Sequence, residues 1–202
     1  MENNFKKTLV IVDVQQDFYS KSGRLYVEGA ERLPQKIVKR IKDSNYDAVI
    51  LTIDSHPQKH CSFMENGGIW PYHCIHGSEG AGVADSIIDA LMETNTNFYI
   101  YEKGNDENRE EYGAFRELKR YKNPFFRLFC NDYYKKLYKI LKNSEDIEIL
   151  GIAGDYCVKN TLNEMIKFID NKKMWVNASC TKSIDDGTLL EQFCNKHGIS
   201  II

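Results

Sequence analysis

The chain has 202 residues, of which 42% are hydrophobic and 28% are charged, and its formal net charge is −2. This length suits one globular domain, and we predict a single domain over residues 1–202. The near balance of charges gives no electrostatic basis for binding nucleic acid or a membrane surface, so neither is expected as a partner. No apolar run approaches the ~20 residues of a membrane span, and the N-terminus lacks a signal-peptide pattern, so a cytoplasmic location is expected.

Apolar, β-branched segments recur along the chain with helical patterns between them. The expected strands are 8–14, 47–54, 97–103, 147–153, 173–179 and 198–202. The expected helices are 30–45, 82–94, 131–143, 157–170 and 187–198. Because the first, second and fourth strands are almost continuously apolar, they are typical of strands covered on both faces. The alternation predicts a three-layer α/β fold, with a mostly parallel six-stranded sheet and helices on both faces.

Several residues mark the faces and ends of these helices. In segment 82–94, Val83, Ile87 and Leu91 lie four apart and predict one buried face. Asn131 is placed to cap the start of the next helix, and Gly198 to end the last one. Two connections, 55–80 and 104–130, are longer than such a fold requires, and long connections in compact domains tend to carry function.

Reactive side chains follow four of the expected strands. Asp13, Asp54 and Lys103 stand at the ends of the first three strands, and Cys157 follows the fourth. In an open parallel sheet, ligands bind outside the carboxyl ends of the strands, where these four side chains converge. Asp13 alone would suit a turn, Lys103 alone the surface, and Cys157 alone a buried helix start. Their coincidence at one edge favours a catalytic site.

The chemistry of such a site is acyl transfer through a thioester. Cys157 would open the helix that begins "CVKNTLNEM", and a helix N-terminus and a nearby Lys103 ammonium both lower the pKa of a thiol. Asp13 would accept the thiol proton and return it to a leaving amine. Unpaired backbone N–H groups around "IAGDYC" could form an oxyanion hole.

The 55–80 connection carries residues that suit a metal ion. Asp54 and His56 lie two apart in an extended segment and point the same way, and "WPYHC" adds His73. One carboxylate and two imidazoles suit Zn²⁺, with Fe²⁺ or Mn²⁺ as alternatives. Glu65 or Ser62 could supply a further contact.

Two other histidines of the same connection, His60 and His76, are decoy candidates for the metal site. The six cysteines, at positions 61, 74, 130, 157, 180 and 194, form no CxxC pair. A chain of this size folds without disulfides, and cytosolic thiols are usually reduced, so no structural disulfide is expected.

Five motifs together give the chain a family resemblance. They are "IVDVQQDF", "DSHPQKHCSF", "GGIWPYHCIHGSEGA", "YEKG" and "GIAGDYCVKNT". The sequence resembles the nicotinamidases, which belong to the isochorismatase-like cysteine hydrolases, from residue 9 to about residue 187. An Asp–Lys–Cys triad alone would indicate only the superfamily, whereas the "DxH…WPxHC" pattern indicates the nicotinamidase branch.

The resemblance implies roles for the residues already singled out. Cys157 would be the nucleophile, Asp13 the general acid/base and Lys103 the support of the thiolate. Asp54, His56 and His73 would hold a divalent metal, usually zinc, that binds the pyridine nitrogen of nicotinamide. The implied reaction is deamidation of nicotinamide to nicotinate and ammonia in NAD salvage, with pyrazinamide as a side substrate. The resemblance also implies a homo-oligomer.

The resemblance extends to the substrate pocket. Phe18 and Trp70 match the aromatic positions that line the ring pocket, and Tyr112 matches the tyrosine of a Y-S-A-F segment. The bond between Ile152 and Ala153 corresponds to a cis peptide bond in relatives. That bond would direct the Ala153 N–H, together with the Cys157 N–H, at the oxyanion.

Departures from the family pattern lie at the margin of this pocket. His76 stands where glutamine is common, and Gly113 replaces the usual serine of the Y-S-A-F segment. Segment 104–130 matches least, so the departures concern the lid and substrate margin.

The sequence also leaves other functions open. A related amidase acting on another small amide would not need Asp54, His56 and His73 together. A non-enzymatic binding or redox protein could use Cys157 as a peroxide-sensing thiol. A vinyl-ether hydrolase is disfavoured, because ether cleavage needs no acyl nucleophile such as Cys157.

Overall fold

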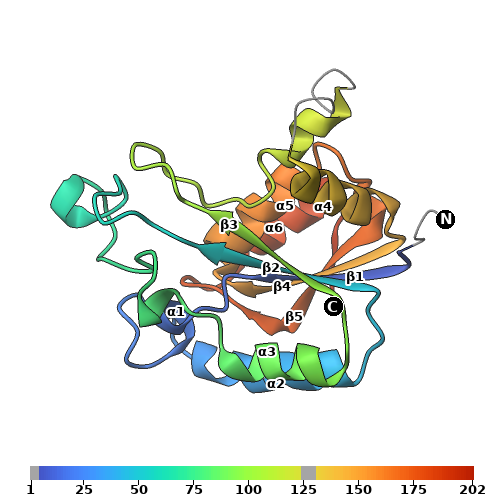
Figure 1. Ribbon diagram of the computed structural model, residues 1–202, viewed down its shortest axis with the longest axis horizontal. Helices are drawn as coiled ribbons and strands as arrows, with labels where there is room; N and C mark the ends of the chain where they lie inside the picture. Colours follow the sequence, from blue (N-terminus) through green and yellow to red (C-terminus); the bar gives the residue numbers. More distant parts are fainter. Residues whose placement is uncertain (1–4, 124–130) are drawn as a thin grey trace.

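The computed structural model describes residues 5–123 and 131–202 and is built around one six-stranded sheet (Figure 1). The strand order is β3-β2-β1-β4-β5-β6, and every pairing among these strands is parallel. The strands are β1 (Lys7–Val12), β2 (Ala48–Asp54), β3 (Phe98–Lys103), β4 (Asp146–Ile152), β5 (Met174–Lys182) and β6 (Ser200–Ile201). The α/β prediction is confirmed, and "mostly parallel" becomes parallel throughout.

Helices cover both faces of this sheet and complete the predicted three layers (Figure 1). One face carries α2 (Leu33–Lys42) and α3 (Asp85–Glu93); the other carries α4 (Asp132–Asn143), α5 (Lys159–Met165) and α6 (Thr188–His197). Successive side chains of β1 explain why both faces are covered. Leu9 and Ile11 belong to one apolar core, and Val10 and Val12 belong to the other. A strand buried on both faces needs this continuous apolar run.

The structure confirms both helix caps that the sequence predicts. The Asn131 side chain accepts a hydrogen bond from the Tyr133 N–H at the start of α4, and Gly198 ends α6 in a left-handed conformation. Helix α3 starts at Asp85, so the prediction that Val83 belongs to this helix is wrong. Val83 instead forms a β-bridge with Gln15, a tertiary pairing that outweighs the helical spacing.

Short helical segments fill the connections. Within residues 5–123 and 131–202 they include α1 (Gln16–Tyr19), which the periodicity did not predict, and a π-helical turn at Gly154–Val158. The 3₁₀ segments of this described part are Ala30–Arg32, Met64–Asn66, Glu79–Ala81, Leu118–Lys122 and Asn171–Lys173. The π-helical turn corrects a prediction: Cys157 lies within it and does not open the α-helix, because α5 begins two residues later at Lys159. Such single turns are frequent at functional sites.

The order in which strands join the sheet changes sides between β1 and β4. From β1 the chain first adds β2 and β3 on one side, and then β4, β5 and β6 on the other. In open α/β sheets, the crevice at such a switch point is where ligands bind. Asp13 follows β1, and the turn that carries Cys157 follows β4, so both flank this crevice.

Strand β3 lies at one edge of the sheet, and a side chain from α4 contacts its outer backbone. The Tyr133 hydroxyl accepts a hydrogen bond from the Ile100 N–H at 2.8 Å and donates one to the Ile100 carbonyl at 2.7 Å. Both groups of one edge residue are therefore satisfied by a single phenol.

A buried carboxylate organises the sheet face under α2. Glu148 is fully buried on β4 and receives two hydrogen bonds from Arg40, at 2.8 and 2.7 Å. Tyr46 and Asn177 each donate a further hydrogen bond of 2.7 Å to it. Burial would raise the pKa of Glu148, but the hydrogen bonds from Arg40, Asn177 and Tyr46 outweigh it and lower the pKa.

Glu148→Gln is expected to lower the free energy of unfolding by about 2–4 kcal/mol at neutral pH. This is below the roughly 3–5 kcal/mol for breaking a fully buried pair, because the Arg40 side chain keeps 30% of its surface exposed. Because the pKa of Glu148 is lowered on folding, its stabilisation is present above the ordinary value near 4.5 and is lost as pH falls below it.

Urea titrations at pH 7 and at pH 4 and below measure this difference. The gap between wild type and Glu148→Gln should narrow with acid, and a gap that widens would contradict the network's role. Glu93→Gln is the matched control, because Glu93 forms an exposed ion pair with Lys42 and should change stability by no more than about 0.5 kcal/mol.

Two further expectations concern thiols and membranes. Cys61, Cys74, Cys157, Cys180 and Cys194 are free thiols, and Cys130 lies outside the described residues. In residues 5–123 and 131–202, no helix combines the length and apolar character needed to cross a bilayer.

Candidate active site

Asp13, Lys103 and Cys157 meet at the carboxyl edge of the sheet, as the sequence predicts. The Lys103 ammonium lies 2.9 Å from an Asp13 carboxylate oxygen and 3.6 Å from the Cys157 sulfur. All three residues are buried, with 0%, 3% and 6% of their surfaces exposed in the order Asp13, Lys103 and Cys157. The lysine therefore lies between the carboxylate and the thiol, in contact range of both.

Backbone and strand register place these groups. Asp13 adopts a left-handed conformation with φ of 50°, which Asp tolerates better than most residues, and its N–H donates to the Thr52 carbonyl. The Thr52 hydroxyl donates to the other Asp13 oxygen at 2.6 Å. Asp54 and Lys103 are register partners on β2 and β3, so their side chains lie side by side and form an ion pair.

Burial and neighbouring charges shift the pKa values of Asp13 and Lys103. Burial raises the pKa of Asp13, against the attraction of the Lys103 ammonium and with the repulsion of Asp54. Burial alone would lower the pKa of Lys103, but Asp13 and Asp54 outweigh it and hold the lysine charged. A carboxyl group with a raised pKa suits a residue that must both take and return a proton.

The pKa of Cys157 corrects a sequence-based expectation. We expected Lys103 and a helix N-terminus to lower it, but the pKa lies well above the ordinary thiol value. Burial of the sulfur raises the pKa most, Lys103 lowers it, and the Asp13 and Asp54 carboxylates raise it further. Cys157 therefore rests as a thiol, and a base must remove its proton before it can attack.

Asp54, His56 and His73 also come together. Each offers a ligand atom, and these atoms lie within 4.8 Å of one another in a buried cluster. The His56 Nδ1 bonds the Gly104 carbonyl at 3.0 Å, and the His73 Nδ1 bonds the Pro71 carbonyl at 2.8 Å. Because backbone carbonyls accept from Nδ1, each Nε2 lone pair is left to face a metal ion. The donor set fits a divalent cation.

Gly104 explains one requirement of the "YEKG" motif. Its φ is 75°, and a Cβ built there would lie 2.5 Å from the His56 ring. A side chain at this position would push His56 away from Asp54. Glycine therefore allows the carbonyl to approach the imidazole.

The remaining metal candidates are not part of the cluster. His60 stacks on His56 at 4.2 Å, but its ring nitrogens bond the Ser62 hydroxyl and the Arg109 carbonyl. His76 bonds the Ser55 hydroxyl. Ser62 is thus engaged by His60, and Glu65 is exposed on its 3₁₀ turn and is not brought to the cluster.

The three predicted aromatic residues line one pocket beside the triad and metal cluster. Phe18, Trp70 and Tyr112 all contribute to its walls, together with Asp54, His73, Ala153 and Cys157. The Trp70 indole donates to the Tyr112 hydroxyl at 3.0 Å, and Phe18 lies 5.5 Å from the His73 ring. An aromatic slot next to a thiol is suited to hold a flat ring.

Sequence reasoning missed several residues of this pocket. Tyr156 packs edge-on against Trp70, with ring centroids 5.2 Å apart, and its position next to Cys157 was the available signal. Glu110 also lines the pocket, and burial, followed by repulsion from Asp54, raises its pKa. Segment 104–130 matches the family pattern least, so no motif pointed to Glu110.

Gln15 is a further residue that sequence reasoning missed, and its side chain bonds the backbone of Asp54. Its side-chain amide donates to the Asp54 carbonyl, and its oxygen accepts from the Asp54 N–H, both at 2.8 Å. The same amide also donates to the Ala81 carbonyl at 2.8 Å. This pairing of β2 with the chain after β1 fixes the backbone that carries Asp54.

The backbone around the thiol has the form expected from the resemblance. The Ile152–Ala153 peptide bond is cis. The Ala153 carbonyl accepts hydrogen bonds from the N–H groups of Tyr156 and Val158, on either side of Cys157. These bonds close the turn that directs the sulfur into the pocket.

Comparisons with known proteins show which family the chain resembles. No protein-family model matches the chain. The nicotinamidase of Saccharomyces cerevisiae is 30% identical over 181 residues, covering 77% of this chain and 79% of the relative. The crystal structure of the yeast nicotinamidase bound to the inhibitor nicotinaldehyde has 25% identity and a TM-score of 0.75, covering 97% of this chain and 99% of that one.

A third comparison concerns the fold. The pyrazinamidase of Pyrococcus horikoshii, solved in complex with zinc, has 23% identity and a TM-score of 0.70, covering 98% of each chain. The yeast relative is similar over most of both sequences, and the residues of the matching motifs converge on one pocket. The chain therefore belongs to the nicotinamidase family of isochorismatase-like hydrolases.

Proposed function

We propose that this protein hydrolyses nicotinamide to nicotinate and ammonia through a thioester on Cys157. The observation that carries the proposal is the contact of one buried lysine with both a carboxylate and a thiol, beside an aromatic pocket. Membership of the nicotinamidase family supports nicotinamide as the substrate. The relative named nicotinamidase/pyrazinamidase from Mycobacterium tuberculosis supports pyrazinamide as a side substrate.

The proposed reaction uses the residues in sequence. Asp13 takes the thiol proton, and the Cys157 thiolate attacks the carboxamide carbon. The tetrahedral oxyanion, held by the N–H groups of Ala153 and Cys157, collapses and expels ammonia with the proton from Asp13. Water, deprotonated by Asp13, then cleaves the thioester to release nicotinate and restore the thiol. Lys103 stays protonated and offsets the negative charge at each step.

Asp54, His56 and His73 would hold a divalent metal, with Zn²⁺ preferred for this donor set and Fe²⁺ or Mn²⁺ as alternatives. When bound, such an ion supplies a Lewis-acidic contact for a ring nitrogen. Glu110 is better placed than Glu65 to provide a further carboxylate, because it lines the pocket that Asp54 and His73 also line. Phe18, Trp70 and Tyr112 would orient the ring toward Cys157.

Reduced protein loaded with zinc should release ammonia from nicotinamide, and nicotinate should appear in equal amount. Dialysis against a strong chelator is expected to remove this activity, and added Zn²⁺, Mn²⁺ or Fe²⁺ should restore it. Elemental analysis verifies removal and reloading. Full turnover by protein verified to be metal-free would contradict the proposed role of Asp54, His56 and His73.

A binding or redox protein that keeps this fold is the alternative from another class. It would show no ammonia release when fully reduced and metallated, yet Cys157 would react with peroxide. The buried thiol with a raised pKa disfavours it, because redox-sensing cysteines are accessible and have a low pKa.

A further inference from the structure

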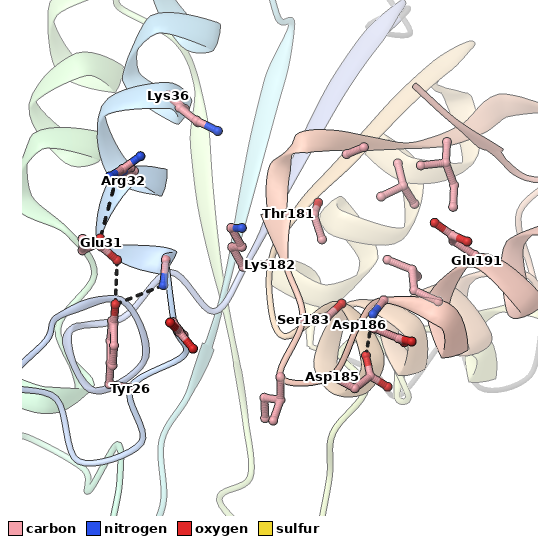
Figure 2. A pocket seen from close by; sticks show the side chains of 18 of the residues that line it. Tyr26, Glu31, Arg32, Lys36, Thr181, Lys182, Ser183, Asp185, Asp186 and Glu191 are labelled. Carbon is pink, nitrogen blue, oxygen red and sulfur yellow. Dashed lines mark hydrogen bonds and ion pairs between the residues drawn. The ribbon is translucent and has the colours of Figure 1, made fainter.

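A second hollow lies directly beside the catalytic pocket. This outer groove, of about 820 Å³, runs between the segments 26–32 and 181–191. Figure 2 shows Glu31 and Arg32 on one wall, Asp185 and Asp186 on the other, and Lys182 between them. The groove therefore carries side chains of both charges, and none of these side chains takes part in the proposed reaction.

One apolar side chain lines both hollows. Ile184 belongs to the walls of the outer groove and of the catalytic pocket, and it is 47% exposed. From the opposite wall, Val27 lines the catalytic pocket and is 4% exposed, while its neighbours Tyr26 and Glu28 line the groove. The partition between the two spaces is therefore the Ile184 side chain on one wall and the 26–28 segment on the other.

The backbone beneath Ile184 is fixed to the nucleophile turn. The buried Asp155 carboxylate, two residues before Cys157, accepts hydrogen bonds from the Ile184 N–H at 3.0 Å and the Asp185 N–H at 2.9 Å. These bonds hold the 184–185 backbone at a set position relative to the sulfur. The width of the opening between pocket and groove is then decided by the side chain at position 184.

We propose that Ile184 determines substrate specificity, by closing the catalytic pocket on the side of the outer groove and limiting the size of the acyl ring. The groove is then an unused extension of the pocket, which shortening this side chain opens. The substrates it would admit are nicotinamides with a bulky ring substituent, whose far end meets the polar groups of the groove. This proposal rests on the proposed amidase function.

The test compares wild type, Ile184→Ala and Leu189→Ala on nicotinamide and on phenyl-nicotinamides substituted at each free ring carbon. The measured quantity is the ratio of kcat/KM for each bulky amide to that for nicotinamide. For at least one isomer, Ile184→Ala should raise this ratio about tenfold or more, since one methylene in an apolar pocket changes kcat/KM by roughly 10–200-fold. Leu189 is equally exposed, at 47%, and is outside both sets of lining residues, so Leu189→Ala should leave the ratio unchanged.

The outcomes separate the two proposals. If wild type turns over nicotinamide but Ile184→Ala changes no ratio by more than about twofold, the partition is wrong and the amidase function stands. If wild type does not turn over nicotinamide, calorimetry with the matching phenyl-nicotinates tests the Ile184 proposal by itself. Relative to its affinity for nicotinate, Ile184→Ala must then bind at least one phenyl-nicotinate more tightly than wild type does. Equal relative binding in all variants would overturn the inference.

Discussion

Cys157→Ala is expected to abolish ammonia release from nicotinamide, with a loss on the order of 10⁴–10⁶-fold, because removing the nucleophile of a covalent mechanism leaves only binding and polarisation. The substitution removes one buried sulfur atom and should leave the fold intact, as circular dichroism and thermal unfolding will show. Acid-quenched wild type should carry a nicotinoyl group by mass spectrometry during turnover, and Cys157→Ala should carry none.

Cys180→Ala is the matched control for this prediction. Cys180 is also a buried free thiol, 3% exposed, but it lies on β5 outside the residues that line the catalytic pocket. It should keep full activity and acquire the same nicotinoyl group. Ammonia release by Cys157→Ala at more than a trace of the wild-type rate would show that the thioester route is wrong.

Asp13→Asn should lower kcat by about 10²–10⁴-fold, the usual contribution of general acid–base catalysis. An asparagine keeps the shape of the side chain and can still accept from Thr52, but it cannot take the proton from a thiol whose pKa is raised. Nicotinate affinity, measured by calorimetry, should change little. Retention of more than about a tenth of the rate would argue against the assigned role of Asp13.

The pH dependence of kcat/KM tests the role of the Asp13 carboxylate independently. Wild-type kcat/KM should rise with pH as the Asp13–Cys157 pair loses a proton, because only the ionised pair can deliver the thiolate. Since burial raises the pKa of Asp13, this rise should lie above the ordinary carboxyl range. In Asp13→Asn the low-pH limb should be displaced, which a purely structural defect would not produce.

The positions of the reactive residues could be predicted from sequence because each depends on a local pattern. Asp13, Asp54 and Lys103 follow apolar strands, and the parallel arrangement brings strand ends to one edge whatever the loops do. The two metal-facing histidines come from a short spacing and a distinct motif. These positions can therefore be predicted without knowing which distant segments pack together.

The features that could not be predicted depend on tertiary contacts. Val83 has helical spacing but pairs with Gln15, and Gln15 in turn holds the backbone of Asp54. The predicted direction of the Cys157 pKa shift was wrong, because burial of the sulfur raises the pKa most. That burial depends on how distant parts of the chain pack around the sulfur. Glu110 comes from the connection that matches the family pattern least, two residues before Tyr112 and outside any matching motif. Residues 124–130 of that connection lie outside the described residues.

The contact between Tyr133 and Ile100 bears on how copies of this chain could assemble. A strand from a neighbouring molecule would have to bind the outer N–H and carbonyl of Ile100, and one phenolic oxygen already occupies both. Continuous growth of the sheet past β3 into a fibre is therefore blocked at its midpoint. If the chain forms the homo-oligomer that the family resemblance implies, we expect its contacts to use surfaces other than the outer edge of β3.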